Sequence, residues 1–154
     1  MARVSFTREE YRSEVALQMM AGLLADLNRR YGPGEFGPID ESRFRPPDGV
    51  FLVAWLDGRP IGSGAFWRAA PDTAELKRMY VSEEMRRGGV GKAILDELEQ
   101  RARMAGYARV QLETGVGQPE AIGLYESAGY TRIPCYPPYD RDPDSICFER
   151  RLAG

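Results

Sequence analysis

Two stretches of the chain carry apolar residues at helical spacing. In residues 15–27 and again in residues 90–102 the apolar positions recur every three or four residues, which predicts two amphipathic helices. Thr7 with Glu10 three residues later has the pattern of a capping box, so we expect the first helix to begin there. Gly22 predicts a kink in that helix or a break into two.

Between the two helices the pattern changes to apolar runs and turns. A Gly- and Pro-rich stretch at residues 31–49 is expected to be mostly loop. Residues 50–68 form two apolar runs joined at Asp57-Gly58, a dipeptide that suits the tight turn of a hairpin. Residues 73–81 continue as a third strand of this meander, and a Gly-rich segment leads from it directly into the second helix.

After the second helix the chain returns to strands. The pattern predicts a strand at residues 107–115, a short helix at 118–129, and two last strands at 130–133 and 145–152. Because a helix precedes the strand at 107–115, this strand can lie parallel to the one before it. The chain is therefore predicted to be an α/β (α+β) protein with a mixed sheet, folded as one domain over residues 1–154.

Composition and charge exclude several classes of protein. The chain has 154 residues, of which 43% are hydrophobic and 29% charged, as in ordinary globular domains. The net charge of −2 argues against nucleic-acid binding, which needs a basic face. No apolar run approaches membrane-spanning length and the N-terminal residues are charged, so we expect no membrane partner and a cytoplasmic location.

The chain contains no histidine and two cysteines, Cys135 and Cys147. Without histidine, Ser-His-Asp and Cys-His nucleophilic arrangements are excluded. The cysteines lack the Cys-x-x-Cys spacing of a zinc or dithiol site, so we expect no metal site and interpret both as reduced or buried thiols with a packing role. Acid-base chemistry is left to carboxylates, tyrosine, lysine, cysteine or water.

The Gly-rich segment at residues 86–92, "RRGGVGK", is the clearest candidate for ligand binding. It opens a helix, whose first N–H groups have no partners within the helix and attract phosphate. Glycine lets the backbone approach an anion closely, while arginine and lysine add positive charge. The spacing matches neither an ATP-binding P-loop nor a dinucleotide fingerprint. The segment is therefore interpreted either as a pyrophosphate site or as a strand-to-helix turn with solvated arginines.

Other motifs surround this segment. "ELKRMYV" is followed by Arg86-x-x-Gly89-x-Gly91, then by "VQLETG" and "QPEAIGLYESAGY". In this order the motifs resemble the GNAT superfamily of acetyl-CoA-dependent N-acetyltransferases. The resemblance implies a single-domain GNAT fold, with a mostly antiparallel sheet of six to seven strands and helices on both faces. It also implies two splayed parallel strands at an acetyl-CoA cleft.

The resemblance further implies roles for particular residues. Tyr125 matches the tyrosine that protonates the departing thiolate, and the ordinary pKa of tyrosine leaves it protonated at neutral pH; a tyrosine packed in the core is the alternative. Gln118 stands where many members have an asparagine that contacts the cofactor or a water. The pantetheine arm is expected to pair with the backbone of Met79, Tyr80 and Val81. The loop expected to wrap the pyrophosphate of coenzyme A consists of Arg86, Arg87, Gly88, Gly89, Val90, Gly91 and Lys92.

The identity of the general base is left open. Glu75 matches a position at which several members of the family carry glutamate, and Glu113 on the next strand or a water chain are the alternatives. Strand alternation predicts that Glu75 shares a face with Lys77, Met79 and Val81. It likewise places Glu113 on one face with Gln111, so that either glutamate can line the cleft. A solvated charge on a half-exposed strand is the other interpretation of each glutamate.

The acceptor site is expected at the loop of residues 29–48 and at the tail of residues 135–145. Arg43 and Arg45 are candidates to hold a carboxylate of the acceptor. Candidate aromatic contacts are Tyr31, Phe36, Trp67, Tyr136 and Tyr139.

Our leading hypothesis is an acyltransferase that moves an acetyl group from acetyl-CoA to a primary amine of a small molecule, such as an amino acid or an amine metabolite, by direct attack in a ternary complex. The alternatives are a protein N-terminal or lysine acetyltransferase and a non-catalytic acyl-CoA-binding module. The resemblance also allows a homodimer, formed through an exposed last strand.

Overall fold

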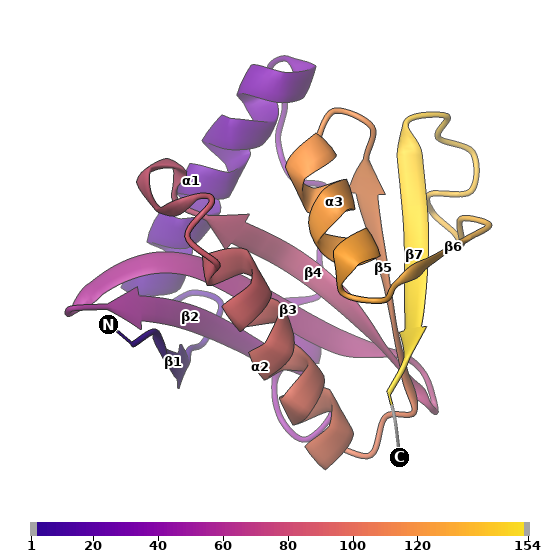
Figure 1. Cartoon of the computed structure of the whole chain (residues 1–154), viewed down its shortest axis with the longest axis horizontal. Coiled ribbons are helices and arrows are strands. Elements are labelled where there is room, and N and C mark those ends of the chain that lie inside the picture. Colours follow the sequence, from indigo (N-terminus) through magenta and orange to yellow (C-terminus); the bar gives the residue numbers. More distant parts are fainter. Residues whose placement is uncertain (1–2, 153–154) are drawn as a thin grey trace.

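One seven-stranded sheet organises the chain (Figure 1). The structure is a computed structural model that describes residues 3–152. The strands are ordered β1-β2-β3-β4-β5-β7-β6, and every neighbouring pair is antiparallel except β4 and β5. This confirms the predicted mixed, mostly antiparallel sheet. In chain order the elements are β1 (Ser5–Arg8), α1 (Glu14–Tyr31), a 3₁₀ helix η1 (Glu41–Phe44), β2 (Val50–Leu56), β3 (Arg59–Ala70), β4 (Thr73–Val81), η2 (Glu83–Met85), α2 (Val90–Met104), β5 (Arg109–Gly115), α3 (Pro119–Ser127), β6 (Thr131–Ile133) and β7 (Ser145–Arg151).

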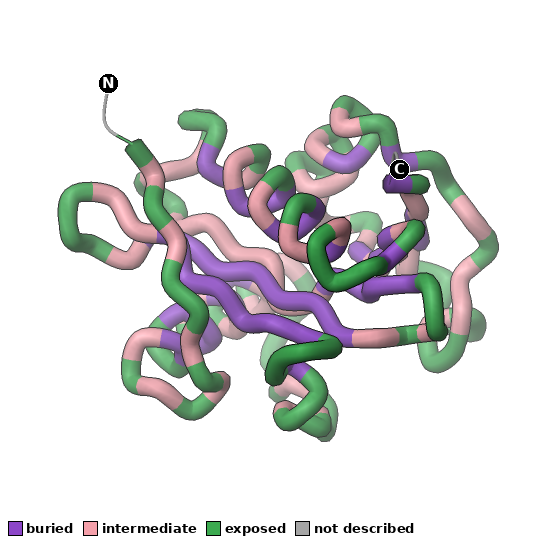
Figure 2. Tube along the Cα trace, turned by 90° about the horizontal axis from the view of Figure 1, so that it is seen from below, coloured by how far each residue is buried: buried purple, intermediate pink, exposed green. Residues whose placement is uncertain are grey.

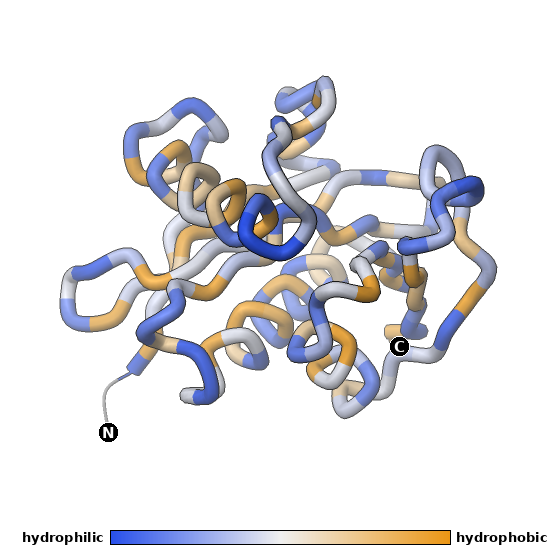
Figure 3. Tube along the Cα trace, turned by 90° about the horizontal axis from the view of Figure 1, so that it is seen from above, coloured by the Kyte–Doolittle hydropathy of each residue, from blue (hydrophilic) through white to orange (hydrophobic). Residues whose placement is uncertain are grey.

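Helices cover both faces of the sheet, as expected. α1 packs on one face over Phe51 and Val53, and α2 and α3 pack on the other over Leu52 and Leu76. Figure 2 shows the central strands buried along much of their length, and Figure 3 shows hydrophobic and hydrophilic stretches alternating along the coils of the helices. Each helix buries only the side that faces the sheet, which explains the helical spacing of the apolar residues. None of the helices in residues 3–152 combines the length and the apolar character that a membrane crossing requires.

α1 begins later than the capping-box pattern predicts. Thr7 lies in β1, where it pairs with Val53 of β2. The helix begins at Glu14, and the Ser13 hydroxyl accepts the Ala16 N–H at 3.2 Å. The predicted start at Thr7 is therefore wrong, because strand pairing at the sheet edge engages the backbone groups that a helix would need.

Gly22 and Gly58 are needed for different reasons, one for close packing and one for a tight turn. α1 runs without interruption through Gly22, so the predicted break into two helices is wrong. Gly22 faces Tyr80 of β4, whose hydroxyl occupies the space that a Cβ at position 22 would take, and the glycine therefore allows the helix to approach the strand closely. The hairpin predicted at Asp57-Gly58 is confirmed, with φ values of 51° and 76°, because a tight primed turn requires positive φ at both residues.

A bulge in β4 changes which residues share a face of the sheet. Arg78 has a φ of 59°, and the register between β3 and β4 shifts at this point. Glu75 bonds to Trp67 in the α1-side core, whereas Met79 and Val81 pack against the α2-side core. The predicted shared face is therefore wrong for Met79 and Val81, since one inserted residue reverses the alternation beyond it, but it holds for Lys77, which pairs with Glu75.

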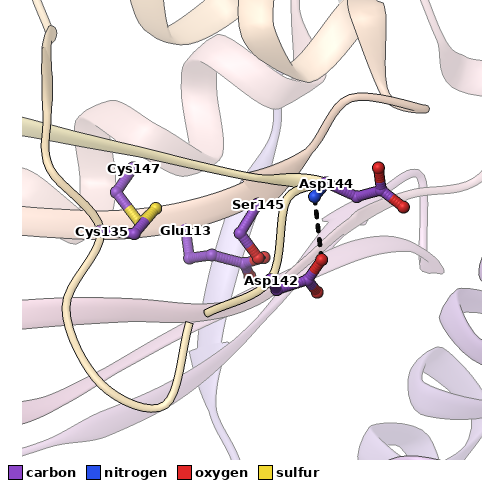
Figure 4. Close-up of a disulfide and its surroundings, with 6 residues drawn as sticks. All are labelled: Glu113, Cys135, Asp142, Asp144, Ser145 and Cys147. Carbon is purple, nitrogen blue, oxygen red and sulfur yellow. Dashed lines mark hydrogen bonds between the residues drawn. A yellow bond between two sulfur atoms is a disulfide. The ribbon is translucent and has the colours of Figure 1, made fainter. Parts of the chain in front are cut away.

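Cys135 and Cys147 form a disulfide, which corrects their interpretation as reduced thiols (Figure 4). Their Cα atoms lie 5.1 Å apart, within the range that a disulfide bridges. The proximity arises because β6 pairs antiparallel with β7 and places Ile133 opposite Cys147, so that Cys135 follows close by. The bond closes the loop of residues 136–144 onto β7.

The last strand is not at the edge of the sheet. β7 lies between β5 and the short β6. The expectation of an exposed last strand is therefore wrong, because both sides of β7 already have strand partners.

Candidate active site

β4 and β5 separate where their parallel pairing ends. They pair from Thr73 with Arg109 to Leu76 with Leu112, and β4 then continues to Val81 paired only with β3. A cleft of about 780 Å³ opens beside this end of β4, bounded by the start of α2 and by α3. The predicted splayed strands are confirmed, and their separation leaves backbone groups of β4 available to a ligand.

The cleft brings together nearly all the residues predicted to hold the cofactor. Gly88 is the one predicted residue that does not line it. Tyr125 of α3 lines it as well, together with residues of α1 and α3 that sequence reasoning missed, among them Asp26, Arg30 and Leu124. The predicted cofactor residues found in the lining are Met79, Tyr80, Val81, Arg86, Arg87, Gly89, Val90, Gly91, Lys92 and Gln118.

The loop before α2 has the backbone geometry of an anion site. Arg87 and Gly89 have φ values of 68° and 83°, and Gly89 is the N-cap residue of α2 without a side-chain cap. The first N–H groups of the helix are thus left without a capping side chain, where the helix dipole adds positive potential. A Cβ at position 89 would meet no atom within 4 Å, so there is open space beside this backbone. Both features fit a pyrophosphate group.

Arg86 is held by α1 and β4. Its Nε donates to the Val81 carbonyl at 3.0 Å, and its Nη1 lies 3.3 Å from Asp26 Oδ1. The largely buried Asp26 also pairs with Arg29 and Arg30. Burial raises the pKa of this carboxyl, but the charges of Arg86 and Arg30 outweigh burial and hold the pKa below its usual value. In the sequence, a carboxylate on the apolar face of the helix, followed by two arginines, is the feature that could have indicated this cluster.

A second pocket of about 190 Å³ adjoins the cleft. Leu23, Met79, Gln118, Ala121 and Tyr125 line both cavities. The other walls of the small pocket come from α1, β4, β5 and two loops, and they combine charged with apolar side chains. They include Leu27, Phe36, Glu75, Lys77, Arg78, Glu113 and Tyr139.

Tyr125 stands where the cleft and the small pocket meet. Its side chain is 4% exposed, and its ring packs against Tyr130 and Phe148 at centroid distances of 5.7 and 6.0 Å. Burial, and after it the negative charge of Glu113, raises the pKa of the Tyr125 hydroxyl. The hydroxyl therefore stays protonated at neutral pH, which is the state that a proton donor needs.

The two candidate bases have different surroundings. Glu75 Oε1 accepts from Trp67 Nε1 at 3.1 Å, and its Oε2 lies 3.7 Å from Lys77 Nζ. Glu113 accepts a hydrogen bond from the Ser145 hydroxyl at 2.7 Å, and Figure 4 shows these two side chains next to each other. Burial raises the pKa of Glu113 above its usual value, although the Ser145 hydrogen bond and the Lys77 charge oppose the shift. Glu113 is therefore the carboxylate better suited to accept a proton near neutral pH.

The arginines expected to hold an acceptor lie elsewhere. Arg43 stacks over the Trp67 ring at 3.8 Å and donates to the Arg68 carbonyl, and Arg45 pairs with Glu10 at 2.8 Å. Neither arginine lines the cleft or the small pocket. The structure does not bring them to either cavity, because η1 packs this part of the loop against β2 and β3.

The aromatic candidates divide in two groups. Phe36 and Tyr139 line the small pocket, and Tyr136 packs edge-on against Tyr139 with ring centroids 5.8 Å apart. Tyr31 and Trp67 line neither cavity. The loop after α1 and the loop before β7 therefore each contribute one aromatic residue to the wall of the small pocket.

Comparison with known proteins agrees with this geometry. The sequence profile of the Acetyltransferase (GNAT) family matches residues 17–130. An IAA acetyltransferase from Azospirillum brasilense is 34% identical over 156 residues, which cover 99% of this chain and 100% of that protein.

Two solved structures share the fold. A candidate acyl-CoA N-acyltransferase from Klebsiella pneumoniae is 26% identical, with a TM-score of 0.81 over 97% of this chain and 98% of that one. A GNAT family acetyltransferase from Elizabethkingia anophelis with acetyl-CoA bound is 16% identical, with a TM-score of 0.72 over the same shares of the two chains. The family profile spans most of the chain, and the splayed strands flank a cleft at the uncapped start of α2. This chain therefore belongs to the Acetyltransferase (GNAT) family of acetyl-CoA-dependent acyltransferases.

Proposed function

We propose that the protein transfers the acetyl group of acetyl-CoA to the primary amine of a small molecule, by direct attack in a ternary complex. The observation that carries this proposal is the position of Tyr125, which is shared by the long cleft and the small pocket. With the donor in the cleft and the acceptor in the pocket, the reacting groups meet beside a buried proton donor. The relative named IAA acetyltransferase supports acetyl transfer as the reaction.

The cleft offers the contacts that coenzyme A needs. The start of α2, with residues 86–92 before and within it, would hold the pyrophosphate. The unpaired edge of β4 at residues 79–81 would hydrogen-bond the pantetheine arm. Gln118 accepts a hydrogen bond from the Tyr31 hydroxyl at 3.4 Å, which directs its oxygen to α1 and leaves its amide N–H groups for the cofactor. Acetyl-CoA supplies the activated acetyl group.

Two side chains move the protons. Glu113 accepts the proton that the amine loses while the amine nitrogen bonds to the acetyl carbon. The bond between that carbon and sulfur breaks, and Tyr125 donates its proton to the departing sulfur. The products are an amide and a thiol, and exchange with solvent returns both side chains to their starting states. We assign the base to Glu113 because the charge of Glu75 is already paired with Lys77.

The small pocket suits a compact acceptor. Its volume of about 190 Å³ has room for roughly six water molecules, at about 30 Å³ each. Phe36 from one loop and Tyr139 from another form part of its walls. A molecule with few atoms beyond its amine fits this enclosure better than an extended peptide.

Isothermal titration of acetyl-CoA into the wild type and two glycine variants tests the first half of the proposal. Gly89→Glu places a bulky negative charge at the phosphate site and should weaken binding more than about tenfold. Gly106→Glu is the matched control, because Gly106 also has positive φ (92°) and open space around it but lies at the other end of α2. Equal affinity in all three proteins would overturn the assignment of the phosphate site.

Acetylation of an amine library, followed by thiol release, tests the second half. The library contains small primary amines, lysine-containing peptides and peptides with free N-termini. The proposal expects the highest kcat/KM for small amines. Faster acetylation of peptides would replace it with a protein acetyltransferase, and acetyl-CoA binding without any acetylated amine would indicate a binding module.

A further inference from the structure

We infer that the acceptor is an amino-acid-like molecule, whose carboxylate is held by Arg78 while its amine faces Glu113. This inference rests on the proposed function, because it takes the small pocket as the acceptor site. It replaces Arg43 and Arg45, which the fold directs elsewhere, with an arginine that lines the pocket itself.

The charges of the pocket carry the first step. Glu75, Lys77, Arg78 and Glu113 all line it. Glu75 and Lys77 compensate each other, since Lys77 Nζ lies 3.7 Å from Glu75 Oε2 and also donates to the Tyr139 hydroxyl at 2.6 Å. Across residues 3–152, neither Arg78 nor Glu113 takes part in an ion pair. The pocket thus presents one positive and one negative group without a charged protein partner.

The setting of Arg78 carries the second step. Its backbone is strained, with a φ of 59°, and the Ser63 hydroxyl donates to its carbonyl at 3.0 Å. Its guanidinium lies 3.9 Å above the Phe36 ring, which fixes the plane of the group and leaves its edge for a carboxylate. A stacked arginine that lines a pocket without an ion pair among residues 3–152 points to an anionic ligand group.

The two unpaired groups complement a single small molecule. A compound that carries both an amine and a carboxylate satisfies Glu113 and Arg78 together within a pocket of about 190 Å³. A simple amine would leave the Arg78 charge unpaired, which is unfavourable at a partly buried site. Leu23 and Leu27 supply apolar wall for the remainder of the acceptor.

Acetylation of matched acceptors tests the inference. For several amino acids, the free acid is compared with its carboxamide and with the amine that lacks the carboxyl group. The wild-type enzyme should show kcat/KM roughly 10- to 100-fold higher for the free acid, mainly through a lower KM, as expected for a charge-assisted hydrogen bond.

Variants of Arg78 test the residue. Arg78→Gln should remove the preference by raising KM for the free acids much more than KM for the carboxamides, and Arg78→Lys should retain part of the preference. Arg68→Gln is the matched control, because Arg68 also stacks on an aromatic ring, that of Tyr107 at 4.7 Å, but lines neither cavity. Arg68→Gln should keep the full preference.

The outcomes separate this inference from the proposed function. Acetylation of amines without any advantage for the free acids overturns the inference and leaves the proposed function standing. An equal loss for acids and carboxamides in Arg78→Gln also overturns it, since this would indicate a structural role. Acetyl-CoA binding with no amine acetylated overturns both. Where a variant fails to fold, the wild-type comparison of acids with carboxamides still decides.

Discussion

Replacing Tyr125 with phenylalanine removes one oxygen atom at the junction of the cleft and the small pocket. The packing of the ring against Tyr130 and Phe148 is retained, so the fold should be preserved. Because burial raises the pKa of the hydroxyl, the proposed proton donor keeps its proton throughout the neutral range. The variant must protonate the leaving sulfur from water, which has poor access to a side chain that is 4% exposed.

The expected magnitude follows from this role. General acid catalysis contributes about 10²- to 10⁴-fold in rate, which corresponds to about 2.7–5.4 kcal/mol of activation free energy. We expect kcat of Tyr125→Phe to fall within this range. The free energy of unfolding should change by about 1 kcal/mol, the usual effect of one hydroxyl.

Tyr130→Phe is the matched control. Tyr130 has the same 4% exposure but lines neither cavity, and its hydroxyl donates to Glu99 at 2.7 Å. Glu99 keeps its ion pair with Arg150 when this hydroxyl is lost. We expect Tyr130→Phe to lower the free energy of unfolding by about 1–3 kcal/mol, because the bond is buried and to a charged group, and to leave kcat unchanged.

Thiol release at saturating acetyl-CoA and acceptor, from about pH 6 to 9, gives kcat for the three proteins. Urea unfolding gives their stabilities. A kcat for Tyr125→Phe within about threefold of the wild type, or an equal loss in Tyr130→Phe, would refute the assignment of Tyr125 as the proton donor.

Further predictions concern the base and the disulfide. Because burial places the pKa of Glu113 above its usual value, kcat should rise with pH as Glu113 loses its proton; Glu113→Gln should lower kcat by about 10²- to 10⁴-fold and abolish this rise. An unchanged rise in the variant would assign the base to another group. Reduction of the bond between Cys135 and Cys147, which are 12 residues apart in sequence, should lower the free energy of unfolding by about 3 kcal/mol, the value for a loop of this order. Reduction should also raise KM for the acceptor without changing the affinity for acetyl-CoA, because the freed loop carries Tyr139. Urea unfolding with and without a dithiol checks the change in stability, and acceptor kinetics with titration of acetyl-CoA under the same two conditions check the change in binding. Identical stability in the oxidised and reduced proteins would contradict the prediction.

Elements defined by local patterns were predictable from the sequence. The hairpin at Asp57-Gly58 depends on two adjacent residues that tolerate positive φ. The buried face of α2 depends on the spacing of its own apolar residues. The loop before α2, with Gly89 at positive φ, likewise lies within a short segment, so the cleft and most of its lining could be predicted.

The start of α1 shows where a local pattern fails. A capping box at Thr7 is a valid signal for a helix, but β1 pairs with β2 at the same residues. A backbone N–H group that donates to a neighbouring strand cannot also donate within a helix. The strand β2, which is distant in sequence, provides that competing partner, and a local pattern cannot show it.

The sequence by itself determined the order of the helices and strands from α1 to β7, the Gly-rich loop before α2 and the tyrosine of α3, because each depends on residues close together in the chain. Only the tertiary structure decided which side chains meet in the small pocket. The bulge at Arg78 reversed the faces of β4, the pairing of β6 with β7 brought Cys135 to Cys147, and the contact of Glu75 with Lys77 left Glu113 as the free carboxylate. These outcomes depend on strand register and on packing between distant segments, and a shift of one residue in a strand exchanges the side chains between the two faces of the sheet.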